Sequence, residues 1–400
     1  MSSPPIVYLD TQDYSRFGDV LRGKSDGATE ALFTALVARK HSGDAIFAVS
    51  MPILGELLQY DADYRDTTIR KAEAVERLCG AWALAYPTRL IAAEIAEAAI
   101  RRGAIPNAQD TRILSPDRYW YPNVSDSFAD VRSTWRQTVD AELATLPSRA
   151  LRRQIARKAR KIDLAKMAQL AAPKMAEKYG LPLNAISGSL VALMGGAITP
   201  EEASRRLFTA IAEPVKFVET YFEKMESDRS LPDWIGKTGR TFQDSFIALR
   251  DQLQPFMHLD LARDQFQATL VDRAGEMARK VLHMANDDTA EFGVDAALRD
   301  TLLCDASFAA EVPVCEIVNA VMHAYISQIM GLTGSEAKIE RSFGGDLIHA
   351  FYLPHVDLWR GDRRFSALLK DAVPHRANRI VPALRELPAA IDKWRADRAP

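Results

Sequence analysis

The sequence predicts an α/β fold that a long helical segment interrupts, and three observations support this prediction. Short apolar runs alternate with helical patterns over roughly the first hundred residues. From about residue 104 to residue 338, helical periodicity dominates and strand-like runs are scarce. Strand character then returns near residue 356. Strands that are separated by helices of this length indicate βαβ units, and therefore a parallel sheet.

The first elements are two strands, each followed by a helix. The run Pro5–Asp10 is expected to form the first strand, and a polar turn should lead from it to a helix over about residues 28–41. Ala45–Ser50 is the second expected strand. Ser50 is a suitable N-cap for a helix over Met51–Tyr60, because its hydroxyl can accept a hydrogen bond from the first helical turn.

The elements that follow complete the first α/β part. A helix is expected over about residues 66–85, a short strand within Leu84–Ile91, and another helix over Ala92–Arg102. At the other end of the chain, Val356–Asp362 has the character of a strand. Asn378–Leu384 is expected to form at most an edge strand, because Pro382 within it cannot donate to a neighbour.

The middle of the chain is expected to be helical. Its predicted helices are Ser127–Leu146, Arg149–Tyr179, Pro200–Asp228, Arg240–Gln254, Asp264–Ala285 and Val312–Met330. Pro173 and Pro214 fall inside two of them and should kink or break the helix there. The sequence therefore predicts a core split into residues 1–103 and 339–400, with an all-α insertion over residues 104–338.

Composition excludes several classes of protein. Hydrophobic residues make up 48% and charged residues 26%, and the formal net charge of -2 gives no global basic field. Three well-separated cysteines form neither a disulfide framework nor a zinc pattern. The start of the chain lacks a secretory signal, and the longest weakly apolar run, Ser189–Ile198, is too short to cross a bilayer. We therefore expect a cytoplasmic protein with no membrane partner.

Four acidic residues stand where an α/β sheet places its functional sites. Asp10 ends the first strand, Glu56 lies on the helix after the second, Asp346 opens a late helix, and Asp362 closes the last strand. The carboxyl ends of parallel strands meet at one edge of the sheet, so these side chains should converge. Four carboxylates without lysines between them repel each other unless a cation is bound. A magnesium-dependent site is therefore expected.

These acidic residues lie in four short motifs that occur in a fixed order. The motifs are Ile6–Asp10, Met51–Leu57, Gly345–Ala350 and Asp357–Phe365. As an ordered set they resemble the PIN-domain nucleases, over roughly residues 4–102 and 339–390. The resemblance implies a three-layer α/β/α sandwich with a central parallel sheet, and hydrolysis of a phosphodiester, usually in RNA, with Mg²⁺ or Mn²⁺ as the cofactor. It also implies that Asp10, Glu56, Asp346 and Asp362 are the catalytic, metal-binding residues.

Arg360 departs from the family pattern. Many members of the family carry Thr or Ser two residues before the last acidic residue, where this chain has Arg360. Arg360 shares a strand face with Asp362, so its guanidinium should point toward the site. There it would either bind a substrate phosphate or neutralise Asp362 and weaken metal binding.

A basic stripe is a second candidate for phosphate binding. Arg149, Arg153, Arg157 and Arg160 recur at spacings of three and four, which places them near one helical face. Such a stripe can follow a phosphate backbone, and Arg153 and Arg157 are its central members. The alternative is an ordinary solvated helix face.

Three other polar residues near these motifs also have structural interpretations. Asp13 is expected at the rim of the site or as a helix cap, and Asp357 should face away from Asp362. His349 lies almost one helical turn after Asp346, so it either reaches a phosphate or packs in the core.

The leading functional prediction is a divalent-metal-dependent endoribonuclease, with DNA as the alternative substrate. Its rival is a catalytically weak PIN-like binding or scaffold protein. In that rival, the helical insertion forms the interface with a protein partner or with a second copy of the chain.

Overall fold

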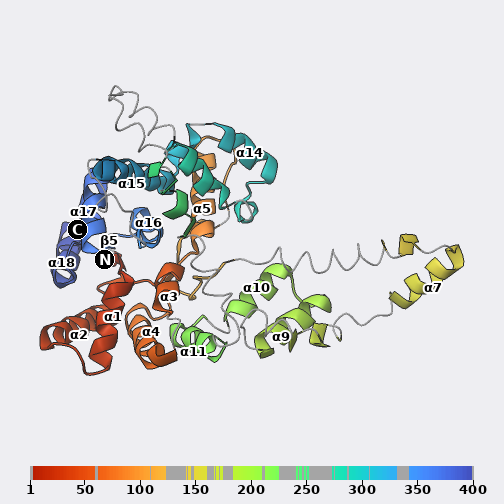
Figure 1. Cartoon of the computed structure of the whole chain (residues 1–400), viewed down its shortest axis with the longest axis horizontal. Coiled ribbons are helices and arrows are strands. Elements are labelled where there is room, and N and C mark those ends of the chain that lie inside the picture. The colour runs from red at the N-terminus through yellow and green to blue at the C-terminus, as the bar shows by residue number, and fades with distance from the viewer. Residues whose placement is uncertain are drawn as a thin grey trace. The chain divides into compact units, whose positions relative to one another are not determined.

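Three short parallel strands form the centre of the fold, in the order β2-β1-β5. They are β1 (Ile6–Tyr8), β2 (Ile46–Phe47) and β5 (Leu358–Trp359). The first strand therefore pairs with segments from both ends of the chain, and the late helices drawn in blue lie beside the early ones drawn in red (Figure 1). This confirms the predicted parallel sheet and the return of strand structure after the middle of the chain.

The computed structural model describes most of the chain. The described residues are 3–58, 62–108, 110–122, 141, 143–145, 148–159, 166, 168–170, 172–173, 183–209, 212–224, 240–241, 243–245, 247–248, 250–251, 273, 275–285, 288–305, 307–330 and 342–398. The chain forms two compact units, one of residues 1–120 and 232–400, and one of residues 121–231. These limits differ from the expected insertion limits of 104 and 338. Most of the predicted helix Ser127–Leu146 lies outside the described residues, and so do six positions of the predicted helix Arg240–Gln254.

The sheet continues on both sides through single bridges. Val49 pairs in parallel with Ala83, and Trp359 pairs in parallel with Ile380. Ala83 belongs to β3 (Ala83–Leu84), which also pairs antiparallel with β4 (Leu114–Ser115). The expected edge strand near the C-terminus is thus reduced to Ile380, because the preceding residues 374–379 form a 3₁₀ helix.

The expected polar turn after the first strand is wrong, because that segment is helix α1 (Thr11–Leu21). Asp10 caps this helix by accepting a hydrogen bond from the backbone N–H of Thr11. Tyr14 and Phe17 are fully buried, and they supply the apolar face. Buried polar residues beside them interrupt the hydrophobic pattern, which explains why the sequence does not show the helix.

The remaining helices of the first third agree with the predictions except at their ends. They are α2 (Gly27–His41), α3 (Met51–Leu57), α4 (Arg65–Cys79) and α5 (Pro87–Arg101). Helix α4 is shorter than expected: it ends at Cys79 and does not continue to residue 85. Gly80 follows it with a φ of +60°, a backbone conformation that suits glycine. Helices α1, α2 and α4 pack together, and they lie side by side in Figure 1.

The C-terminal part of the first unit adds helices around the late strand. They are α14 (Ala296–Cys304), α15 (Pro313–Met330), α16 (Phe343–Ala350), α17 (Arg363–Ala372) and α18 (Leu387–Asp397). Short 3₁₀ helices occupy residues 62–64, 289–292, 308–311, 353–355 and 384–386. Helix α15 packs against α16 and α17, and α16 packs against α3. The contact between α16 and α3 brings His349 close to Glu56.

The second unit is helical in its described part. It contains α7 (Arg149–Ala159), α9 (Leu183–Met194), α10 (Pro200–Thr209) and α11 (Pro214–Lys224). The expected break at Pro214 is confirmed, because α10 ends before it and α11 begins at it. No helix in the described parts of either unit is long and apolar enough to cross a membrane.

Candidate metal centre

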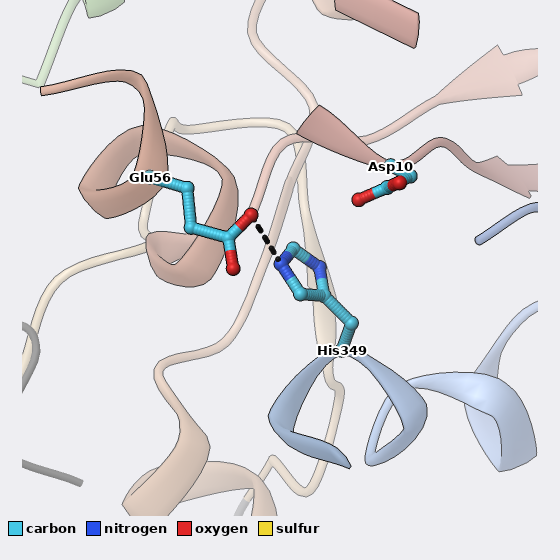
Figure 2. A group of neighbouring side chains, drawn as sticks. All are labelled: Asp10, Glu56 and His349. Atoms are coloured by element: carbon cyan, nitrogen blue, oxygen red, sulfur yellow. Dashed lines mark ion pairs between the residues drawn. The ribbon is translucent and has the colours of Figure 1, made fainter. Parts of the chain in front are cut away.

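The candidate site is built where β1, α3 and α16 meet. Asp10 follows β1 and begins α1, Glu56 lies near the end of α3, and His349 lies near the end of α16 (Figure 2). Their ligand atoms all lie within 4.8 Å of one another, as in sites that hold a metal ion. The structure thus brings together two of the four predicted acidic residues, which are separated by 46 positions in the sequence, and adds a histidine.

His349 forms the contact that joins the group. Its Nε2 lies 3.2 Å from Oε2 of Glu56, the pair marked in Figure 2. His349 is 2% exposed and Asp10 is 8% exposed, whereas the side chain of Glu56 is 42% exposed. The group therefore has a buried side and a side that solvent or a ligand can reach.

A buried tyrosine fixes the orientation of the imidazole. Nδ1 of His349 lies 2.5 Å from the Tyr8 hydroxyl, which in turn lies 2.9 Å from the Ser50 hydroxyl. The Tyr8 ring stacks on Tyr352 and on Trp359, with centroid distances of 5.3 and 6.5 Å. Ser50 begins α3 as expected, but its side chain contacts Tyr8 instead of capping the helix. These contacts leave Nε2 of His349 directed toward Glu56.

Gly345 allows Glu56 to approach α16 closely. A Cβ atom at position 345 would lie 2.7 Å from Oε1 of Glu56, which is closer than real contacts of a Cβ atom. The absence of a side chain at this position is therefore required for the observed place of the carboxylate. The close approach of Glu56 from α3 requires glycine at this position, whereas the backbone conformation of α16 does not.

The charges of Glu56 and His349 depend on each other. Burial alone would lower the pKa of His349, but the Glu56 carboxylate, with Asp10 and Asp346, raises it to about 9. Burial likewise acts to raise the pKa of Glu56, and the positive charge of the nearby His349 reverses this effect, so the pKa of Glu56 lies below its usual value. At neutral pH the imidazolium therefore faces an ionised Glu56.

Burial and the charges of His349, Glu56 and Asp10 shift the pKa of Asp346. Burial, followed by the carboxylates of Glu56, Asp10 and Asp362, raises the pKa of Asp346 to about 7 against the opposing effect of His349. Burial also raises the pKa of Asp10. Asp346 does not cap α16, because Ser342 occupies the N-cap position and Asp346 lies within the first turn. Asp346 is part of the same acidic environment, although it is not in the group of three.

Asp13 and Arg360 form a buried ion pair beside Asp10. Nη2 of Arg360 lies 3.2 Å from Oδ1 of Asp13, and the two residues are 3% and 0% exposed. Burial raises the pKa of Asp13 to about 7, and Arg360 opposes that rise. The partner of Arg360 is therefore Asp13, whereas the sequence suggested a phosphate or Asp362. The protein itself supplies two cationic side chains, Arg360 and His349, to the acidic residues.

No family model, curated protein or solved structure matches this chain.

Asp362 has a structural role as a helix cap. Its Oδ1 accepts hydrogen bonds from the backbone N–H groups of Arg364 and Phe365, so it caps α17. It also raises the pKa of Asp346, which places it at the edge of the acidic environment. Asp357 accepts a hydrogen bond from the backbone N–H of Ile6 and pairs with Arg398, in agreement with the expectation that it faces elsewhere.

The basic stripe lies on α7, in the second unit. Arg153 and Arg157 are exposed there, as are Arg149 and Arg152. Arg160, the last member of the predicted stripe, lies outside the described residues. Binding of a phosphate backbone by Arg153 and Arg157 remains a prediction.

Several buried polar atoms beside Asp10 have no hydrogen-bond partner within the described part of the chain. They are Oγ1 of Thr11, both carboxylate oxygens of Asp13, Nε2 of His349, and the Nε and Nη1 atoms of Arg360. Such atoms are uncommon inside proteins. The sequence contained one signal for the missed ligand, because His349 follows Asp346 by three residues and so shares its side of α16.

Proposed function

We propose that this protein is a PIN-like, divalent-metal-dependent nuclease that hydrolyses phosphodiester bonds in RNA. One observation carries the proposal: Asp10, Glu56 and His349 offer ligand atoms within 4.8 Å of one another. They lie at the carboxyl end of a parallel sheet, where α/β proteins bind their ligands. The resemblance of the four acidic motifs to PIN-domain nucleases indicates the reaction and makes RNA the expected substrate.

The donor atoms fit a divalent cation. Asp10 and Glu56 provide carboxylate oxygens, the ligands that Mg²⁺ and Mn²⁺ prefer. Nε2 of His349 suits Mn²⁺ better than Mg²⁺, because an imidazole is a softer donor than a carboxylate. The Tyr8 hydroxyl beside Nδ1 provides the hydrogen bond by which metal-binding histidines are usually oriented. Asp346 adds negative charge beside this set.

Each residue then has a defined task. Asp10 and Glu56 would hold the cation, with His349 as the third ligand once it has lost its proton. A cation bound there supplies a water molecule of lowered pKa and stabilises charge on the phosphodiester oxygens. Asp346 would accept a proton or orient water beside the group, since its carboxyl group exchanges a proton near neutral pH. Tyr8 and Gly345 keep His349 and Glu56 in place.

A specific observation favours the rival function, a PIN-like binding or scaffold protein. His349 is ion-paired with Glu56, and Arg360 is ion-paired with Asp13. These cations reduce the repulsion that would otherwise require a metal ion. In the rival function, the two ion pairs are structural, and the helices of the second unit provide a surface for a protein partner or another copy of the chain.

Cleavage and metal binding together separate the two functions. Purified wild type is incubated with mixed RNA and DNA substrates in Mg²⁺, Mn²⁺ or EDTA, and Mn²⁺ binding is followed by electron paramagnetic resonance. The test variant is Asp10→Asn, which retains an N-cap for α1 but removes a charged ligand. Asp117→Asn changes an exposed carboxylate and serves as the matched control.

The nuclease proposal expects metal-dependent cleavage of RNA by wild type and Asp117→Asn, with loss of both Mn²⁺ binding and cleavage in Asp10→Asn. Equal cleavage by all three proteins would show a different site or a contaminating nuclease. No bound Mn²⁺ and no cleavage by wild type would instead support the binding or scaffold function.

A further inference from the structure

A pocket of about 230 Å³ lies among residues of α15, α16 and α17, and it includes Asp362. Its apolar lining comes from Tyr325, Phe343, Phe365 and Leu368, which are 7%, 3%, 5% and 6% exposed. Polar and apolar groups contribute about equally to the lining, and a concave surface with apolar walls and convergent polar groups is the usual form of a small-ligand site. The volume is below the range of about 300–1,000 Å³ that is typical for drug-sized ligands, so a single planar ring system is the appropriate size.

The aromatic residues of this pocket hold one another in place. The rings of Tyr325 and Phe343 stack with their centroids 4.0 Å apart, and Phe365 meets Phe343 edge to face at 5.9 Å. Because the three rings come from three different helices, the packing of those helices fixes the apolar lining before a ligand arrives. A preformed aromatic surface suits a flat ligand, since little side-chain entropy is lost on binding.

Polar side chains at the edge of the pocket determine which ligand it can accept. They comprise two carboxylates, one guanidinium and one amide: Asp362, Asp371, Arg364 and Gln328. The carboxylates are hydrogen-bond acceptors, and they give this edge a net charge of one negative unit by residue type. The edge therefore disfavours a phosphate inside the pocket and favours a group that presents N–H donors.

The pocket adjoins the candidate metal centre. Asp362 lines the pocket and also raises the pKa of Asp346. Phe343 in the pocket and Asp346 beside the metal centre are three residues apart on α16, so they lie about one helical turn from each other. A ligand that spans both places would put a ring in the pocket and a phosphate near Asp10, Glu56 and His349.

We propose that this pocket binds a nucleobase of the RNA substrate next to the phosphodiester bond at the metal centre. The inference rests on the proposed nuclease function and adds a specificity site to it. Bases with an exocyclic amino group, namely adenine, cytosine and guanine, offer donors to Asp362 and Asp371. Uracil lacks that group and is expected to bind most weakly.

The pocket can be tested without cleavage, in EDTA, by measuring the binding of fluorescent four-nucleotide RNAs by anisotropy. Ala367 lies on the exposed side of α17 and lines the pocket, so Ala367→Trp should fill it. Ala396→Trp introduces the same side chain at an exposed position of α18 and is the matched control. Asp371→Asn tests the polar edge with a smaller change at an exposed residue.

We expect Ala367→Trp to weaken the binding of oligo(A) about tenfold, which matches the loss of one stacked base. Asp371→Asn should reduce the preference for oligo(A) over oligo(U), whereas Ala396→Trp should bind both RNAs as wild type does. Mn²⁺ binding should be the same in all four proteins, because none of the changed residues belongs to the group of three ligands.

Unchanged RNA binding in both Ala367→Trp and Asp371→Asn would overturn the pocket proposal, even if wild type binds Mn²⁺ and cleaves RNA. The opposite result separates the two proposals as well. If these variants lose base binding while wild type binds no Mn²⁺ and cleaves nothing, the base pocket stands and the nuclease function fails.

Discussion

Replacing Asp346 by asparagine should stabilise the metal-free protein at pH 8. Asp346 lies in an acidic environment, in which burial and the carboxylates of Glu56, Asp10 and Asp362 raise its pKa from 3.8 to about 7. It is not the cap of α16, so the replacement removes no capping hydrogen bond. Asn keeps the shape of the side chain and cannot ionise. The variant therefore relieves the cost of an ionised Asp346 in the folded state.

The sign and size of the effect follow from linkage. Asp346 binds its proton more tightly in the folded state than in the unfolded state, so the free energy of unfolding falls as pH rises from about 4 to about 7. One pKa unit corresponds to about 1.4 kcal/mol, and the rise from 3.8 to about 7 gives a loss on the order of 4 kcal/mol at pH 8. Asp346→Asn should lack this loss and should match wild type near pH 4.

The assay is urea unfolding at pH 4, 6 and 8 in EDTA, repeated with Mn²⁺. In EDTA the stability difference between Asp346→Asn and wild type should grow with pH, whereas Asp117→Asn should follow wild type. Mn²⁺ that binds only the folded state raises the free energy of unfolding, by about 2.7 kcal/mol at 100 times its Kd. This increase should be larger for wild type than for Asp346→Asn, because the variant lacks the negative charge beside the metal centre. Equal stability of Asp346→Asn and wild type at pH 8 in EDTA would refute the argument.

Three further predictions concern neighbouring residues and the basic stripe. The pKa of His349 rises from 6.5 to about 9 on folding, so its stabilising effect is complete below pH 6.5 and is lost as pH rises through 9. His349→Gln should lack this decline, on the order of 3 kcal/mol in urea unfolding, and an unchanged decline would assign it to other groups. Gly345→Ala should displace Glu56 and weaken Mn²⁺ binding in titrations, while the free energy of unfolding changes by less than about 2 kcal/mol, since only the end of a flexible side chain must move. Unaltered Mn²⁺ affinity would show that Glu56 is not a ligand. Arg153→Gln with Arg157→Gln should reduce the slope of log K for RNA against log salt by about 0.7 for each phosphate that the variant no longer neutralises, and an unchanged slope would remove α7 from the RNA-binding surface.

Local patterns were sufficient to predict the elements that carry the site. The apolar runs that become β1, β2 and β5 are visible in the sequence, and so are helices α2, α3, α5 and α15. The predicted parallel sheet is present, and Asp10 and Glu56 converge as expected. The PIN-like sandwich and the nuclease activity remain predictions.

Helix α1 shows where local patterns fail. Its buried face includes Asp13 and Thr11, which reduce the apolar periodicity that identifies a helix. Asp13 is tolerated in the interior because Arg360, from the other end of the chain, pairs with it. A sequence pattern over a few residues cannot contain a partner that is 347 positions away.

The sequence by itself determined the three segments that form the central sheet, because periodicity, capping and turn preferences act over a few neighbouring residues. Only the tertiary structure decided the charges and partners within the site. It placed Nδ1 of His349 against Tyr8, 341 positions earlier, and Nε2 against Glu56. It also fixed Arg360 on Asp13 instead of on Asp362. Burial and distance set these electrostatic interactions, and both are properties of the folded chain, not of any segment within it.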